Sequence, residues 1–310
     1  MKRCEECGHT VRCCEDDCPI CGGEMRDERD IKVNCAGVTL LELNEVTIPY
    51  KTGEPVRICG LGDIHWGNIA VDEQALDRAV KFICDNHVYV VGMGDMIDSI
   101  NPDDKRFDIK TVRPDFRANL DNLISEQYES LCEKLSQIPA DQWIGIHTGN
   151  HEEVIRTKYY RDVTRDLCRT LKTTYLGYEA WSRIRFERGS INKHVEVFKL
   201  FSTHGSGGAR FDPTKQWKIE HLTNKINADL IMMGHVHSIQ VGRGLKGDIT
   251  TSGELKEVNK TYGWMLTGTF LNKSTEGVIS YAERFNLPPS KTGIATFQIF
   301  PEERRIHVSC

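Results

Sequence analysis

Short apolar runs, each ending at glycine and polar residues, recur along the chain from about residue 55. They are EPVRICGLGDIHWGN, VYVVGMGDMID, DQWIGIHTGNHEE, HVEVFKLFSTHGSGG and ADLIMMGHVHS. A short apolar run that stops at glycine is typical of a buried strand leading into a loop. We therefore predict five strands, each followed by a loop that carries histidine, aspartate or asparagine.

The segments between these runs indicate helices and closing strands. DEQALDRAVKFICDN has apolar residues at helical spacing and acidic residues at its start, where a helix favours negative charge. A long polar and helical stretch is expected from residue 101 to 139, and closing strands in GWMLTGTFLNK and GIATFQIFPEERRIHVS. This order predicts a layered α/β fold, in which ligand sites gather beyond the carboxyl ends of strands.

Composition narrows the class of protein. The chain has 310 residues, 39% hydrophobic and 27% charged, with a net charge of −5, so nucleic-acid binding would need a local basic patch or bound cations. It has no apolar stretch long enough to span a membrane, and MKRCEECGHT is not a secretory signal. We expect a cytoplasmic protein whose cysteines are thiols or metal ligands.

Six cysteines lie within the first 21 residues and form two C-x2-C pairs, CEEC and CPIC. Zinc prefers four thiolates in a tetrahedron, and this segment has almost no apolar residues with which to fold otherwise. We predict a structural zinc ribbon over residues 1–30 and a main domain over 31–310. The expected ligands are Cys4, Cys7, Cys18 and Cys21, with Cys13 and Cys14 as competitors.

The polar loops form an ordered set of motifs. In chain order they are D-x-H (Asp63, His65), G-D-x-x-D (Asp95, Asp98), G-N-H-E (149–152), His204 and G-H-x-H (His235, His237). This set resembles the calcineurin-like metallophosphoesterases from about residue 55 to 237, nearest in kind to the DNA-repair exonuclease and phosphodiesterase members. The resemblance implies a β-sandwich flanked by helices, here preceded by the ribbon.

Holding two divalent cations close together requires a shared anionic ligand, and a carboxylate can bridge where an imidazole cannot. The candidate bridge is Asp95. The resemblance implies that one metal is held by Asp63, His65 and His237, and the other by Asn150, His204 and His235. The mixed nitrogen and oxygen donors favour manganese, with iron or zinc as alternatives.

The resemblance also assigns His151 to the substrate, as the phosphate contact and the acid that protonates the leaving oxygen. Either Glu152 or Asp98 would orient its ring. The implied reaction is in-line attack on phosphorus by a hydroxide that bridges the two metals.

Nucleic acid is the preferred substrate. The helical stretch RTKYYRDVTRDLCRTLK places Lys158, Arg161 and Arg165 at spacings of three or four, as one basic face, and the loop HGSGGARFDPTKQWK adds Arg210. The alternative for this face is an ordinary solvated surface in which the arginines pair with Asp162 and Asp166.

Two other functions stay open. One is a small-molecule phosphodiesterase or phosphatase, acting for example on cyclic nucleotides. The other is a non-catalytic protein that binds through its zinc ribbon. With any of these functions, the ribbon is also a candidate site for a protein partner or for a second copy of the chain. Protein phosphatases of this superfamily have an arginine after G-D-x-x-D, where this chain has Ser99, which argues against a phosphoprotein substrate.

Overall fold

The computed structural model describes residues 2–4, 10–11, 25–27, 44–100, 102–189, 194–249, 254, 257–284 and 286–310. The chain divides into two compact units, Met1–Glu42 and Leu43–Cys310. In the first unit, β1 (Lys2–Cys4) pairs antiparallel with both β2 (Thr10–Val11) and β3 (Met25–Asp27). Of the predicted zinc ligands, Cys4 ends β1. The other three, Cys7, Cys18 and Cys21, lie outside the described residues, as do the competitors Cys13 and Cys14 and the domain boundary predicted at residue 30.

The second unit contains two mixed sheets. One has the order β15 (Arg305–Ser309), β14 (Thr296–Phe300), β5 (Val56–Leu61), β6 (Tyr89–Gly92), β7 (Trp143–His147), β8 (Tyr175–Gly177), and its strands β5 to β8 are parallel. The other has the order β12 (Ile239–Ile249), β13 (Glu257–Thr267), β11 (Leu230–Met233), β10 (His194–Thr203), β9 (Glu179–Arg188), β4 (Asn44–Pro49). In this second sheet β10, β11 and β13 run parallel.

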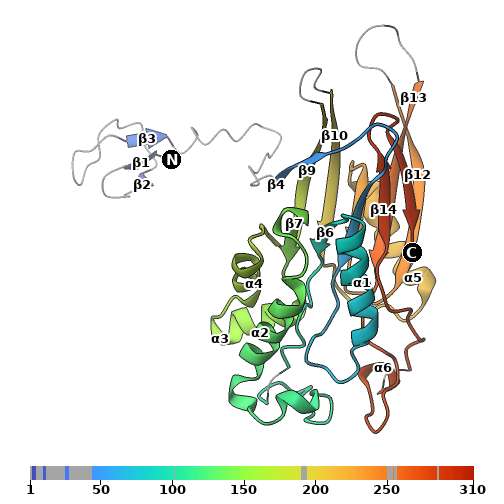
Figure 1. Ribbon diagram of the computed structural model, residues 1–310. Coiled ribbons are helices and arrows are strands. Elements are labelled where there is room, and N and C mark those ends of the chain that lie inside the picture. Colours follow the sequence, from blue (N-terminus) through green and yellow to red (C-terminus); the bar gives the residue numbers. More distant parts are fainter. Residues whose placement is uncertain are drawn as a thin grey trace. The chain divides into compact units, whose positions relative to one another are not determined.

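Helices flank both sheets. On one side are α1 (Glu73–Asp85), α2 (Leu123–Leu135), α3 (Asn150–Tyr159) and α4 (Val163–Leu171), and on the other is α5 (Asp212–Lys225) (Figure 1). A short α6 (Tyr281–Arg284) and 3-10 turns at Pro114–Phe116, Leu120–Asn122 and Ala140–Gln142 complete the described elements. None of the described helices is both long enough and apolar enough to cross a lipid bilayer.

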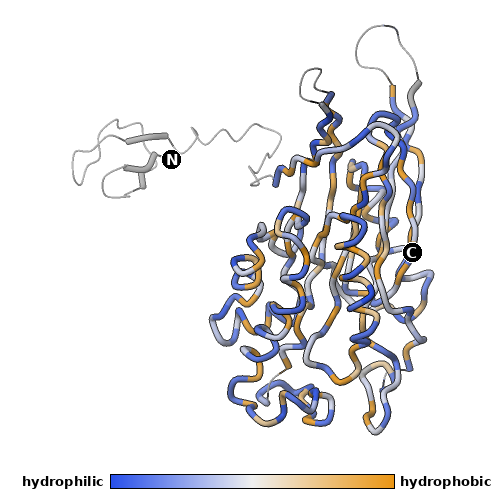
Figure 2. The backbone as a smooth tube through the Cα atoms, in the orientation of Figure 1, coloured by the Kyte–Doolittle hydropathy of each residue, from blue (hydrophilic) through white to orange (hydrophobic). Residues whose placement is uncertain are grey.

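The core lies between the two sheets and beneath the helices. Ile58 and Val91 of one sheet pack in the same cluster as Phe186, Phe198 and Leu200 of the other. A second cluster joins α1 to α4 with the outer face of the first sheet, and a third joins α5 with the second sheet. Hydrophobic residues accordingly run along the strands inside the body (Figure 2). The chain is a mixed α/β protein with two sheets flanked by helices, as predicted.

The five predicted strands correspond to β5, β6, β7, β10 and β11, and the predicted helix to α1. One local prediction was wrong. The stretch from residue 156 to 172 is not one helix, because α3 ends at Tyr159 and Tyr160 takes a left-handed φ of 57°. A new helix then begins, with the side chain of Asp162 accepting a hydrogen bond from the Arg165 N–H at 3.0 Å. The basic residues on the two segments therefore do not share one helical face.

Candidate metal centre

The motif residues come from loops that follow five strands. Asp63 and His65 follow β5, Asp95 and Asp98 follow β6, and Asn150 begins α3 shortly after β7. His204 follows β10, and His235 and His237 follow β11. Because β5 to β7 are parallel to one another, and β10 is parallel to β11, the carboxyl ends of these strands bring the loops together.

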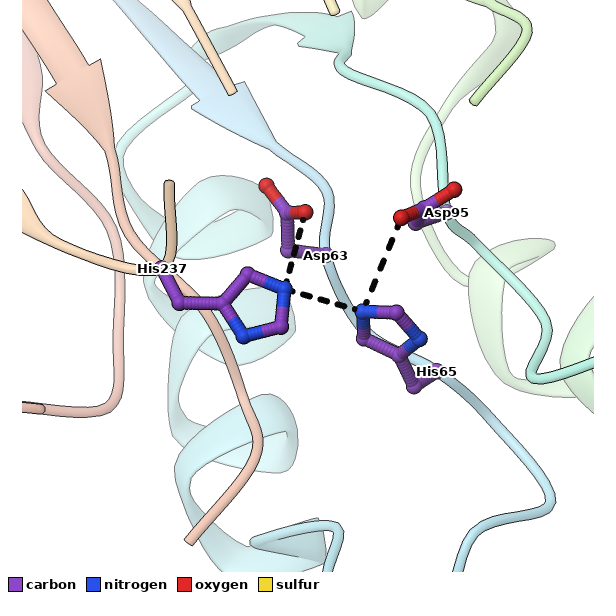
Figure 3. Close-up of side chains that lie close together, drawn as sticks. All are labelled: Asp63, His65, Asp95 and His237. Carbon is purple, nitrogen blue, oxygen red and sulfur yellow. Dashed lines mark hydrogen bonds and ion pairs between the residues drawn. The ribbon is translucent and has the colours of Figure 1, made fainter. Parts of the chain in front are cut away.

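Four side chains, three of them buried and one, His237, half-buried, form a first group (Figure 3). Nε2 of His65 lies 3.1 Å from Nε2 of His237 and 3.8 Å from Oδ2 of Asp95. Nε2 of His237 lies 3.3 Å from Oδ1 of Asp63. The ligand atoms of all four residues lie within 4.8 Å of one another, a clustering that suits a metal ion.

A second group surrounds His204. Its Nε2 lies 3.2 Å from Oδ1 of Asn150, 3.3 Å from Nδ1 of His235 and 3.5 Å from Oδ2 of Asp95. The Asp95 Oδ2 atom thus faces both groups, while Oδ1 accepts a hydrogen bond from the backbone N–H of His151 at 2.9 Å. The structure brings together all seven side chains that the sequence proposed as metal ligands, in two groups that share one carboxylate.

The donor atoms of the first group are arranged more suitably for binding a cation than for hydrogen bonding to one another. Among the described residues, Oδ1 of Asp63 and Nδ1 of His65 are buried without a hydrogen-bond partner. The two facing imidazole nitrogens at 3.1 Å can share one proton at most. Two nitrogens each about 2.1 Å from a zinc-type ion and roughly at right angles would stand about 3 Å apart.

Electrostatics in the second group also favour positive charge. Burial acts to lower the pKa of His204, but the charges of Asp95 and Asp63 outweigh it and raise the pKa to about 10. Burial, with the neighbouring charge of His204, lowers the pKa of His235 to about 4. Burial acts to raise the pKa of Asp95, yet the surrounding histidines hold it well below its usual range. The buried carboxylates of Asp63 and Asp95 therefore retain their negative charge and keep His204 protonated. A metal ion bound at this position would supply the positive charge that the proton supplies here.

The backbone is strained at this centre. Eleven described non-glycine residues have positive φ, and five of them belong to this centre: Asp63, His65, Asp95, His235 and His237. A side chain in this region costs roughly 1 kcal/mol or more, and such residues persist where the surrounding structure enforces them, commonly at functional sites. The residues with strained backbone are thus among those that the sequence motifs proposed as metal ligands.

Two glycines allow the loops after β6 and β7 to touch. A Cβ on Gly149 would lie 2.1 Å from both the backbone nitrogen and Oδ1 of Asp95, and a Cβ on Gly94 would lie 2.6 Å from the nitrogen of Gly149. Only glycine at these positions lets Asp95 approach Asn150 closely enough for both to face His204.

The structure distinguishes the two acids proposed to orient His151. Nδ1 of His151 contacts the backbone carbonyl oxygen of Asp98 and lies 3.9 Å from its carboxylate Oδ1, which is itself 3.6 Å from Nδ1 of His65. Burial acts to lower the pKa of His151, but the charges of Asp95 and Asp98 outweigh it and raise the pKa above the usual value. Asp98 is therefore the acid beside His151, and the contact through Nδ1 leaves Nε2 as the ring nitrogen for a ligand.

Glu152 has a different set of contacts. Its carboxylate accepts hydrogen bonds from the backbone N–H groups of Asp95, Met96, Ile97 and Gly149, at 2.6 to 3.1 Å. Both carboxylate oxygens are therefore engaged by the loops that carry Asp95 and Asn150. The sequence motif gave no sign of this, because the contact depends on the folded path of the loop after β6.

The proposed basic substrate contacts lie on different elements, and two of them are paired. Arg161 donates to Ser125 Oγ at 2.8 Å and lies 3.4 Å from Asp166, and Arg165 lies 3.1 Å from Asp162. The alternative of arginines paired with Asp162 and Asp166 matches the structure. Lys158 is exposed near the end of α3, and Arg210 is exposed in the loop before α5.

Comparisons with known proteins give a distant relationship. No family model matches the chain. The DNA polymerase II small subunit of Thermoplasma acidophilum is 28% identical over 125 residues, which cover 36% of this chain and 24% of that protein. The chain thus spans about a quarter of the length of this curated relative. A solved structure from Plasmodium, GAP50, the anchor in the inner membrane complex, matches 83% of this chain and 88% of that one, at 13% identity and a TM-score of 0.34.

Proposed function

We propose that this chain is a metal-dependent phosphodiester hydrolase that uses two divalent cations and acts on nucleic acid. The observation that carries the proposal is the position of Asp95 Oδ2, which faces two groups of largely buried donors at once. A structural metal site needs one closed group of ligands, whereas a shared carboxylate between two groups is what a pair of catalytic cations requires.

In this proposal Asp63, His65 and His237 hold one cation and Asn150, His204 and His235 hold the other, with Asp95 between them. The mixed imidazole, carboxylate and amide donors suit manganese, iron or zinc. When bound, two such cations activate water and neutralise the charge that develops on the phosphoryl oxygens.

The protein's own contribution to turnover is assigned to His151 and Asp98. The carbonyl of Asp98 accepts the Nδ1–H of His151, which fixes the ring and its tautomer. The Nε2 atom would then contact the phosphate and hold the proton needed by the leaving oxygen. Asp98 acts through His151 and is a positioning residue.

Nucleic acid is proposed as the substrate because the distant curated relative is a subunit of a DNA polymerase. The chain has a net charge of −5, so attraction to a polyanion would come from the bound cations rather than from the overall charge of the protein.

The test is hydrolysis with Mn²⁺ of labelled single- and double-stranded DNA and RNA, cyclic nucleotides, bis-p-nitrophenyl phosphate and p-nitrophenyl phosphate. Asp95→Ala serves as the inactive variant and Asp141→Ala, which changes an exposed aspartate, as its matched control. We expect polynucleotide cleavage by the wild type and by Asp141→Ala, and none by Asp95→Ala.

The other outcomes separate the alternatives. Cleavage of the small diesters alone would replace nucleic acid by a small-molecule substrate. Absence of any Asp95-dependent hydrolysis, in protein that binds Mn²⁺, would reject the enzymatic function and favour a binding protein.

A further inference from the structure

A polar cavity of about 490 Å³ adjoins the metal centre. Thr148, Tyr175 and Tyr178 line it together with two ion pairs of α3 and α4, and we call it the tyrosine pocket. Its volume lies within the range of about 300 to 1,000 Å³ that is usual for small-molecule sites.

The tyrosine pocket shares its wall with the proposed metal ligands. Thr148 lies two residues before Asn150, at the end of β7. The ring of Tyr178 packs edge-on against the ring of His204, with centroids 5.5 Å apart, and its carbonyl accepts the His204 N–H at 3.0 Å. A phosphate on the metal centre would therefore place its ester substituent next to this pocket.

The charges that line the pocket cancel. Arg156 donates to Glu153 at 2.6 and 2.8 Å, and Arg165 donates to Asp162 at 3.1 Å. Since each guanidinium is already paired, and since the two carboxylates would repel an anion, a second phosphate is a poor ligand here. The lining instead offers both hydrogen-bond donors and acceptors to a neutral polar group.

The aromatic side chains favour a flat ligand. The guanidinium of Arg165 lies over the ring of Tyr175, 4.0 Å from its centroid. The hydroxyl of Thr148 donates to the Tyr175 hydroxyl at 2.9 Å, which leaves the tyrosine O–H free to donate. Tyrosine rings and arginine planes are the surfaces on which bases stack, and base edges present donors and acceptors side by side.

We propose that the tyrosine pocket binds the base of one unpaired nucleotide whose phosphate lies at the metal centre. This rests on the proposed function for the phosphate, but the base contact itself needs no metal. A base inside a duplex is stacked on both faces and paired at its edge, so it can enter such a pocket only after leaving the helix. The substrate is therefore a single strand or an unpaired strand end.

The contribution of the base can be measured by comparing two chromogenic phosphodiesters. Thymidine 5′-(p-nitrophenyl phosphate) and methyl p-nitrophenyl phosphate release the same product, but only the first carries a base. In Arg165→Met we expect the ratio of their kcat/KM values to fall about tenfold, in keeping with the loss of one stacking contact. Arg165→Lys should show a similar fall, because lysine keeps the charge and loses the plane. A wild-type ratio in Arg165→Lys would mean that charge, and not stacking, matters, and would overturn the proposal.

Arg169→Met is the matched control, since Arg169 lies one turn further along α4 and pairs with Asp166 as Arg165 pairs with Asp162. Its side chain is 75% exposed and does not line the pocket. We expect a wild-type ratio in this variant. An equal fall in both variants would indicate a general effect on α4 and would overturn the proposal.

A binding experiment separates this proposal from the hydrolase function. Adenosine, guanosine, cytidine and thymidine carry no phosphate, so their binding is independent of turnover. Saturation-transfer NMR measures this binding to the full chain in the presence of chelator. We expect binding that Arg165→Met weakens about tenfold. Absence of nucleoside binding would overturn the pocket even if diesters are cleaved. Arg165-dependent binding without hydrolysis would leave the pocket standing and reject the hydrolase.

Competition identifies the source of the base. A single-stranded oligonucleotide should displace the nucleoside much better than a blunt duplex of the same sequence. Displacement by free mononucleotides alone, with no effect of the oligonucleotide, would overturn the assignment to a strand.

Discussion

The backbone N–H of Asp95 donates a hydrogen bond to Oε2 of Glu152 at 3.0 Å. The N–H of Gly149 donates to the same oxygen, also at 3.0 Å, and the N–H groups of Met96 and Ile97 donate to Oε1. One buried carboxylate therefore ties the loop after β6 to the loop after β7. These loops carry Asp95 and Asn150, so Glu152 connects two proposed ligands although it belongs to neither proposed ligand set.

Glu152→Gln should loosen this connection. The amide keeps one acceptor oxygen and turns an NH₂ group toward backbone donors, which leaves buried N–H groups unpaired. We expect a loss of unfolding free energy of about 2–4 kcal/mol and a fall in Mn²⁺ affinity of about 10- to 100-fold. Denaturant unfolding in chelator and a Mn²⁺ titration measure the two effects. Glu129→Gln, at an exposed glutamate of α2, is the control. Wild-type values for Glu152→Gln would show that the loops hold their positions without it.

Gly149→Ala tests the contact between the same two loops by sterics alone. Gly149 has φ of −93° and ψ of 177°, which any residue can adopt, so backbone strain is not involved. The added Cβ would lie 2.1 Å from Oδ1 of Asp95 and must push it away. We expect at least tenfold weaker Mn²⁺ binding and a destabilisation of about 1–3 kcal/mol. Gly208→Ala is the control, because a Cβ there meets nothing within 4 Å. Tight Mn²⁺ binding by Gly149→Ala would reject the proposed role of this close approach.

His151→Ala separates turnover from metal binding. The side chain of His151 belongs to neither proposed ligand set, while its backbone N–H still holds Asp95 Oδ1 in the variant. We expect kcat for diester hydrolysis to fall about 10² to 10⁴-fold, as for loss of a general acid, with the Mn²⁺ stoichiometry unchanged. His221→Ala, at an exposed histidine of α5, should behave as wild type. Loss of bound metal from His151→Ala would show that the side chain is a ligand and that its assigned role is wrong.

Much of the fold and of the site follows from the sequence, for identifiable reasons. The apolar runs of β5, β6, β7 and β11 are almost wholly buried, and β10 is buried over its last four residues, so their pattern can be recognised in a single sequence. The ligand candidates follow these strands directly, and the parallel direction of neighbouring strands places their loops at one end of each sheet.

Other features depend on contacts that the sequence does not display. The strand Ile239–Ile249 was not predicted, because three glycines and three charged residues interrupt its alternating apolar positions. The break between α3 and α4 could have been found from Asp162, which precedes Val163 as a helix-capping residue does. The four backbone bonds to Glu152 and the tyrosine pocket arise only from loop paths and from α4 lying beside β7 and β8.

His147 provides a pH test at a residue that belongs to neither proposed ligand set. The side chain is fully buried at the end of β7, with Nδ1 3.1 Å from the Gly177 carbonyl oxygen and Nε2 2.8 Å from Ser202 Oγ. Because a carbonyl can only accept, Nδ1 carries the proton and Nε2 accepts from the serine hydroxyl. Burial lowers the pKa of His147 to about 3, so the folded protein keeps this ring neutral in mild acid.

An unfolded histidine takes up a proton near pH 6.5. Between about pH 3 and 6.5 the unfolded chain therefore binds one more proton at this position than the folded chain, and stability falls as the pH is lowered through that window. From pH 7 to pH 5 this one group should remove about 2 kcal/mol of unfolding free energy. His147→Gln offers an amide N–H and an oxygen to the same two partners but does not titrate. Denaturant unfolding of both proteins in chelator measures the unfolding free energy at pH 7 and at pH 5. The decrease between these two pH values should be smaller in the variant by about that amount. Equal decreases would mean that His147 is protonated in the folded protein, which its two hydrogen bonds argue against.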